Sequence, residues 1–127
     1  MYKNVVLDTD VVIHLLRHTA ETVNQFNRFH QAGTLFLLSP MVIAEIYVGA
    51  FAEEYVTIED FFSLCEFAPI TVEIARQAGF YAKQYRKAYH KISLEDYLLA
   101  TTAKINRSPL WTYNIKHFPM EDIELLK

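Results

Sequence analysis

The stretch NVVLDTD at residues 4–10 is the most informative local signal for the fold. Its apolar, β-branched first half favours extended backbone, so residues 4–7 are predicted to form a short strand that ends at Asp8. A helix is expected to follow directly, from about Asp10 to His18. A strand that leads at once into a helix is typical of α/β domains, in which crossover helices join parallel strands.

Short apolar runs and longer helical patterns alternate along the rest of the chain. Gly33 is expected to end one helix, and Pro40 fits the first turn of the next. Helices are predicted over about 22–32, 40–50, 57–64, 71–89 and 93–105, and strands over 35–38, 67–70, 110–112 and 123–126. We therefore predict a single domain over residues 1–127, a three-layer α/β/α fold whose central parallel sheet has four to five strands.

The composition excludes several classes of protein. Hydrophobic residues make up 52% of the chain and charged residues 21%, which favours a packed core over disorder. The one cysteine, Cys65, has no partner for an internal disulfide, so a reducing compartment is expected. The first residues lack the apolar region of a signal peptide, and no apolar run is long enough to span a membrane. We expect a soluble cytoplasmic protein with no membrane segment.

Charge is distributed unevenly along the chain. The net charge is −3, yet the segment from Arg76 to Arg107 holds seven basic and two acidic residues. This segment carries +5 and the remainder −8. A basic region inside an acidic protein can hold a phosphate backbone. Taken alone, however, the pattern is more simply explained by two solvated helix faces.

Three acids stand close to the predicted carboxyl ends of strands, where open α/β sheets bind their ligands. Asp8 follows the first strand, Glu45 lies in an apolar helix, and Asp96 stands three residues after Ser93 at a helix start. Each has a purely structural alternative: Asp8 or Asp10 caps the next helix, Glu45 takes a solvent-facing position, and Asp96 completes a capping box with Ser93.

Together these acids favour a cation site. Apolar neighbours around Glu45 suggest a buried helix, where a carboxylate faces desolvation unless it is paired or metal-bound. Gathered carboxylates also raise each other's pKa unless a cation neutralises them. Because all the candidate ligands are oxygens, hard Mg²⁺ or Mn²⁺ is the expected metal.

Other side chains leave two interpretations open. His14 and His18 have a spacing that can chelate zinc, but Leu15 stands where an HExxH motif has Glu, which favours a surface or packing role. Tyr81, Tyr85 and Tyr89 follow a helical stripe, which suits either a core or dimer face or the stacking of bases. Several aromatic residues are expected at the surface, where they suit contacts with a second copy or another protein; these are Tyr47, Phe51, Phe61 and Phe62.

Four segments resemble the motifs of one known family. They are VLDTDVVI at 6–13, SPMVIAEIYVGA at 39–50, ISLEDYLLATTA at 92–103 and LWTYNIKHF at 110–118. In order and spacing they resemble the four motifs of PIN domains of the VapC type, the toxin ribonucleases of type II toxin–antitoxin systems. Each motif is loose, but the set is specific, and the similarity extends from Val5 to Leu126.

The resemblance implies a PIN-like fold and a metal-dependent endoribonuclease. Asp8, Glu45 and Asp96 would hold Mg²⁺ or Mn²⁺, partly through water, and water would attack the phosphate in line. Thr112 and Asn114 would orient the water or the carboxylates. Many PIN domains have a fourth acid where this chain has Asn114, so one or two metal ions are possible. Asp10 would have a helix-start or supporting role.

The resemblance also implies three partners: an RNA substrate, a cognate antitoxin protein and a second copy of the chain in a homodimer. His117 belongs to the closing motif, and no role for it follows from the sequence.

Two other functions remain open at this point. The pattern Asp8-Thr9-Asp10-Val11-Val12 also fits the opening of haloacid-dehalogenase-like phosphatases, with Asp8 as nucleophile. That fold is normally larger and gives Glu45 and Asn114 no role. A non-catalytic PIN-like scaffold that only binds RNA or a protein is the second alternative.

Overall fold

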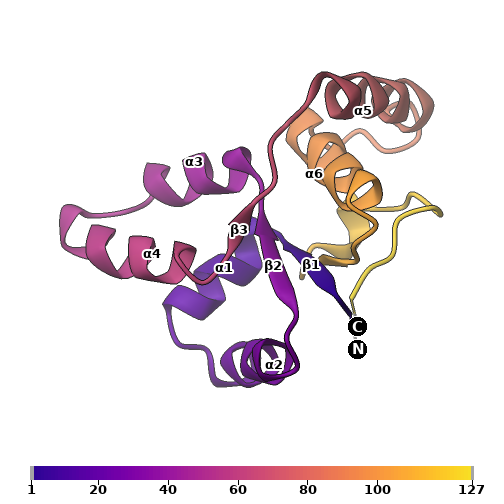
Figure 1. Ribbon diagram of the computed structural model, residues 1–127. Coiled ribbons are helices and arrows are strands. Elements are labelled where there is room, and N and C mark those ends of the chain that lie inside the picture. The colour runs from indigo at the N-terminus through magenta and orange to yellow at the C-terminus, as the bar shows by residue number, and fades with distance from the viewer. Residues whose placement is uncertain (1, 127) are drawn as a thin grey trace.

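The computed structural model describes residues 2–126, in which four parallel strands form one sheet in the order β3-β2-β1-β4. The strands are β1 (Asn4–Leu7), β2 (Leu35–Leu38), β3 (Glu66–Phe67) and β4 (Leu110–Trp111). Figure 1 shows β1 and β2 at the centre of the molecule. In β1, Val5, Val6 and Leu7 are fully buried, as expected for a parallel strand covered on both faces.

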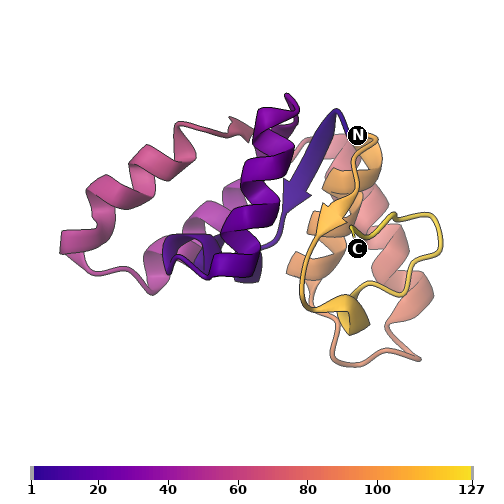
Figure 2. The same cartoon turned by 90° about the horizontal axis from the view of Figure 1, so that it is seen from below.

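Six α-helices cover the two faces of this sheet. They are α1 (Thr9–Leu16), α2 (Ala20–Gln31), α3 (Pro40–Val48), α4 (Tyr55–Phe62), α5 (Val72–Tyr85) and α6 (Leu94–Ile105), with short 3₁₀ helices η1 (Ala52–Glu54) and η2 (Ile115–His117). Figure 2 shows α1 to α4 on one side of β1 and α5 and α6 on the other. The predicted three-layer α/β/α architecture is confirmed.

Local capping signals explain most of the helix boundaries. Ser39 caps α3 ahead of Pro40, and the Thr71 hydroxyl accepts a hydrogen bond from the Ile74 N–H at 3.2 Å to cap α5. Gly33 follows α2 with φ of +87°, a conformation that glycine adopts without strain. Helix α5 ends at Tyr85, four residues earlier than its tyrosine pattern predicted, so Tyr89 lies in the following loop.

Two other sequence predictions are wrong. Residues 123–126 do not form a strand, because only Leu125 pairs with Leu110 and β4 is too short to extend the ladder. The apolar helix α3 is not buried on all sides, since only Val42 and Ile46 are buried.

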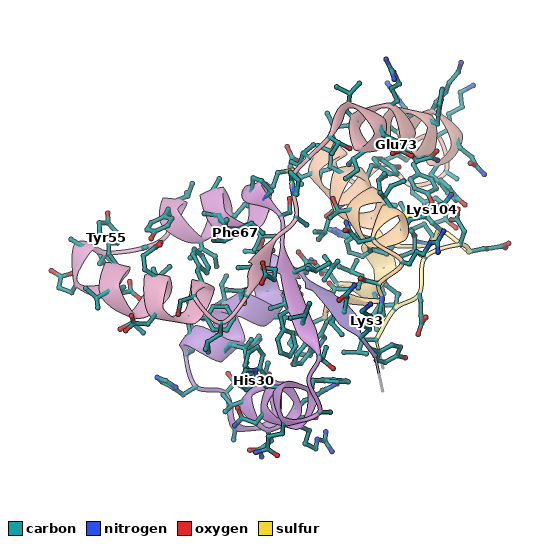
Figure 3. The ribbon with its side chains drawn as sticks, viewed as in Figure 1. Lys3, His30, Tyr55, Phe67, Glu73 and Lys104 are labelled. Atoms are coloured by element: carbon teal, nitrogen blue, oxygen red, sulfur yellow. The ribbon has the colours of Figure 1, made fainter. Side chains whose placement is uncertain are left out.

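Helix α3, η1 and α4 instead form an arm, residues 40–62, that extends away from the sheet (Figures 1 and 2). Tyr55 lies near its outer end (Figure 3). Val48 on this arm is 89% exposed and Phe51 is 72% exposed. Phe62, predicted to be at the surface, is buried against the core because it lies on the inner face of α4.

None of the helices within residues 2–126 combines the length and the apolar character that crossing a lipid bilayer requires.

Tyr97 on α6 provides a test of the core. Its side chain is 2% exposed, and its hydroxyl has no hydrogen-bond partner within residues 2–126. A buried polar group without a partner costs roughly 1–3 kcal/mol. We expect Tyr97→Phe to raise the free energy of unfolding by about 1 kcal/mol, measured by urea denaturation. A loss of stability in this variant would show that the hydroxyl makes a favourable contact, for example with a buried water molecule.

Candidate active site

The carboxyl ends of β1 and β4 lie side by side, because Leu7 pairs with Trp111 in the parallel register. The residues that follow, Asp8 and Thr112, are therefore neighbours. Asp8 lines an open cleft of about 550 Å³ at this edge of the sheet. The cleft also contains the other predicted site residues that reach its surface, namely Asp10, Glu45, Asp96 and Asn114. Thr112 is buried and does not line the cleft.

The Asp8 carboxylate is held at both oxygens. Its Oδ1 accepts a hydrogen bond from the Thr9 N–H at 2.7 Å, and its Oδ2 accepts one from the Thr112 hydroxyl at 2.7 Å. The Thr112 Oγ1 in turn accepts a hydrogen bond from the Asn114 N–H at 2.9 Å. Asp8 therefore caps α1, as its structural alternative predicted, and also presents a fixed carboxylate to the cleft.

The pKa of Asp8 is raised from 3.8 to about 6, and burial is the largest cause. The negative charges of Asp10 and Asp96 also raise it, while the hydrogen bonds from Thr112 and Thr9 oppose the rise. The ionised carboxylate is thus destabilised by its surroundings at neutral pH. A cation bound in the cleft would remove this cost, because it interacts favourably with the ionised form.

Asp96 lies in the first turn of α6. The Ser93 N–H donates to Asp96 Oδ2 at 3.1 Å, and the Ser93 hydroxyl accepts from the Asp96 N–H at 3.2 Å. The predicted capping box is therefore present. The same Oδ2 is the hydrogen-bond partner of His117 Nδ1 at 3.0 Å. The hydrogen bonds with the Ser93 N–H and with His117 both use Oδ2. Asp96 can therefore cap α6 and line the cleft at the same time.

Glu45 reaches the cleft from α3. Its Oε1 accepts a hydrogen bond from the Thr9 hydroxyl at 3.1 Å. The expectation that this carboxylate is desolvated is wrong: Glu45 is exposed, because its side of α3 faces the open cleft rather than the core. The solvent-facing alternative is therefore correct, and it does not remove Glu45 from the site.

Two residues without a firm prediction gain structural roles. The Asp10 carboxylate accepts hydrogen bonds from the Val11 N–H at 2.7 Å and the Tyr113 N–H at 3.0 Å, so it ties the start of α1 to the loop after β4. Burial is the main factor that raises the pKa of Asp10. His117 contacts Asp96 from η2. His117 and Asp96 are 21 residues apart, so nothing in the sequence indicated this contact. The only signal for His117 was its place in the closing motif.

The oxygen donors of the cleft fit a hard divalent cation. Within residues 2–126, no three His, Cys, Asp or Glu side chains are already placed to hold a metal ion directly. Mg²⁺ ordinarily keeps several water molecules and takes only one or two carboxylates directly. The open cleft and its separated carboxylates therefore fit a cation that is bound partly through water. His14 and His18, the possible zinc pair, do not line this cleft.

Comparisons with known proteins agree on one family. The family model described as PIN domain matches residues 5–119. Ribonuclease VapC19 of Mycobacterium tuberculosis is 32% identical over 114 residues, which is 90% of this chain and 91% of that protein. Ribonuclease VapC10 of the same organism is 32% identical over 116 residues, covering 91% of this chain and 86% of that protein.

A solved structure has the same fold. It is VapBC2 from Rickettsia felis bound to a DNA fragment from its promoter. The matched chain has a TM-score of 0.83 and 20% identity, with 97% of each chain covered.

Proposed function

Because this chain belongs to the PIN-domain family and, within it, to the VapC ribonucleases of toxin–antitoxin systems, we propose that its cleft hydrolyses RNA phosphodiester bonds. The observation that carries the proposal is the convergence of Asp8, Glu45 and Asp96 on one cleft from three separate elements. The family assignment also argues against the phosphatase alternative. The three intact acids argue against a scaffold that only binds.

In this proposal Asp8, Glu45 and Asp96 hold Mg²⁺ or Mn²⁺, partly through water. VapC ribonucleases are generally metal-dependent, and oxygen ligands suit these two ions. When bound, such a cation lowers the pKa of a coordinated water and neutralises charge that develops on the phosphate. In-line attack by water would leave 5′-phosphate and 3′-hydroxyl ends.

The remaining residues of the site keep these carboxylates in place. Thr112 holds Asp8 through its hydroxyl, and the Asn114 N–H fixes that hydroxyl in turn. Thr9 donates to Glu45, and His117 contacts Asp96. Partners of this kind set the orientation of metal ligands. Asn114 carries no charge, so a second cation would be held more weakly than in a PIN domain with an acid at that position.

A protein partner is part of the proposed function. The matched solved structure is a VapBC complex, which supports a cognate antitoxin for this chain. The arm, residues 40–62, presents large apolar side chains such as Val48 and Phe51 to solvent. Such groups suit a protein contact, either with the antitoxin or with a second copy in a homodimer.

The direct test is cleavage of end-labelled cellular RNA by the purified chain, freed of any antitoxin. We expect cleavage with Mg²⁺ or Mn²⁺, and its loss in EDTA, because the cation is required to neutralise the phosphate. Restoring the metal after EDTA treatment controls for irreversible damage. Cleavage that persists in EDTA, or a folded and metal-loaded protein that cuts no RNA, would contradict the proposal.

A further inference from the structure

The loop that follows β4, residues 112–114, carries two contacts of the candidate site. Thr112 donates its hydroxyl to Asp8 Oδ2, and the Asn114 N–H donates to that same hydroxyl. The loop lies between the end of β4 and the start of η2, so contacts other than a regular helix or sheet ladder fix its backbone. Its middle residue, Tyr113, stands between Thr112 and Asn114 and can fix both.

Tyr113 is held by α1 and α2. Its N–H donates to Asp10 Oδ2 at 3.0 Å. Its ring lies edge-on to the His14 ring, with the two centroids 5.2 Å apart. The His14 ring is itself fixed, since its Nδ1 lies 2.9 Å from Thr19 Oγ1. The Tyr113 hydroxyl is 2.6 Å from the Thr22 hydroxyl on α2. Tyr113 thus has one contact through its backbone and two through its side chain.

Burial alone does not hold the Tyr113 side chain in place. The residue is 48% exposed, so water can solvate its hydroxyl. Thr22, in contrast, is 1% exposed, and the Tyr113 hydroxyl is its hydrogen-bond partner. A buried polar group that loses its partner costs roughly 1–3 kcal/mol. If the tyrosine moved into solvent, the buried Thr22 hydroxyl would lose this bond, so the fold favours one position of the ring.

We propose that Thr22 is a positioning residue for the cleft and acts through Tyr113. The contacts run from Thr22 to Tyr113, along the backbone to Thr112, and from its hydroxyl to Asp8. Groups that orient metal ligands typically contribute roughly 10–100-fold to metal affinity or activity. Thr22 stands further from the ligand, so we expect an effect at the lower end. This inference rests on the proposed function and adds to it a residue outside all four motifs.

Two substitutions remove this hydrogen bond with little change in shape. Thr22→Val deletes the hydroxyl on α2. Tyr113→Phe deletes the hydroxyl on the loop and keeps the ring that contacts His14. At a fixed Mg²⁺ concentration, each should lower kcat for RNA cleavage about tenfold with KM for RNA unchanged. Thr22→Ser retains the hydroxyl and should cleave RNA like the unmodified chain.

Metal binding provides a measurement that does not depend on cleavage. Mg²⁺ that binds the folded chain raises the thermal unfolding midpoint, and the concentration needed for a given rise reports the affinity. Thr22→Val and Tyr113→Phe should each need about tenfold more Mg²⁺ than the unmodified chain for the same rise. If the Thr22 hydroxyl served only to pack α2, its loss would lower the midpoint in EDTA and leave kcat and the Mg²⁺ dependence unchanged.

Double substitutions test the route from Thr22 to Asp8. Thr22→Val combined with Tyr113→Phe should be no worse than either alone, because both remove the same hydrogen bond. In a chain that carries Thr112→Val, adding Tyr113→Phe should cause no further loss of kcat, because the contact with Asp8 is already absent.

Matched controls are Thr34→Val and Tyr81→Phe. Thr34 is 4% exposed, and its hydroxyl donates to the Tyr2 carbonyl at 2.6 Å. The Tyr81 hydroxyl donates to Asp122 Oδ2 at 2.8 Å. Each control removes a hydrogen-bonded hydroxyl outside the cleft. Both should lower the unfolding midpoint in EDTA without altering kcat or the Mg²⁺ dependence.

The outcomes separate this inference from the proposed function. Metal-dependent cleavage with equal kcat and equal Mg²⁺ dependence in Thr22→Val, Tyr113→Phe and the unmodified chain would overturn the positioning role alone. Additive losses in the double variant would also overturn it, since the two residues would then act separately. Weaker Mg²⁺ binding by both variants, together with no RNA cleavage by the unmodified chain, would support the positioning role and overturn the hydrolysis.

Discussion

Asp8→Asn is expected to reduce metal-dependent RNA cleavage by at least about a hundredfold and, at the same time, to stabilise the metal-free protein. The activity estimate is a lower bound, because changing residues that only orient metal ligands already costs roughly 10–100-fold. The amide oxygen of Asn can accept the Thr9 N–H, and its NH₂ group can donate to the Thr112 hydroxyl, which then accepts instead of donating. The substitution therefore removes the negative charge with little change in shape.

The gain in stability follows from the raised pKa of Asp8. Its folded value of about 6 lies above the ordinary 3.8, so the folded state binds more protons than the unfolded state between these two values. Stability from this group is complete below about pH 4 and is lost as pH rises through 6. The difference amounts to roughly 3 kcal/mol at neutral pH. Asn resembles the protonated carboxyl and does not incur this loss.

Thermal unfolding in EDTA at pH 5 and pH 7.5 tests the argument. The midpoint should be higher for Asp8→Asn than for the unmodified chain at pH 7.5, and the difference should shrink at pH 5. Mg²⁺ should raise the midpoint of the unmodified chain more than that of the variant. Asp60→Asn, at an exposed acid on α4, is the matched control. Equal midpoints for Asp8→Asn and the unmodified chain at pH 7.5 would show that the Asp8 carboxylate is not destabilised in the fold.

The features predicted correctly are those encoded by local signals. The apolar run before Asp8 forms β1, and the parallel register of β1 and β4 then places Asp8 beside Thr112. Ser39, Thr71 and Ser93 cap helices with their own side chains, which a sequence reveals directly. Because Asp8 follows a strand and Asp96 lies at a helix start, the sequence could indicate that these two acids would lie at the same edge of the sheet, where both line the cleft.

The features that were missed depend on distant parts of the chain. The apolar face of α3 indicated burial, but the arm extends away from the sheet and leaves Val48 in solvent. Apolar periodicity does not distinguish a helix in the core from one that is covered by another protein. Residues 88–92, after α5, and residues 113–117, after β4, line one pocket beside the cleft. These two segments lie far apart in the sequence, so only the folded chain shows that Tyr89 and Tyr113 line one space.

Asp96→Asn is the second substitution with a large expected effect, and it separates a metal ligand from a helix cap. As a cap, Asp96 accepts the Ser93 N–H and contacts His117. The amide oxygen of Asn can accept both contacts, so the helix start should remain folded. As a metal ligand, Asp96 contributes negative charge to the cleft, which Asn removes. We therefore expect cleavage to fall at least about a hundredfold with little change in the thermal unfolding midpoint.

Glu73→Gln provides the matched control, since Glu73 is also an acid in the first turn of a helix, α5, but lies outside the cleft (Figure 3). It should leave cleavage unchanged. Raising the Mg²⁺ or Mn²⁺ concentration should partly restore cleavage by Asp96→Asn, because a weakened site fills at higher metal concentration. Intact metal-dependent cleavage by Asp96→Asn would contradict the assignment of Asp96 as a ligand. Its charge would then be unnecessary to the site, and capping α6 would fully explain its presence in the sequence.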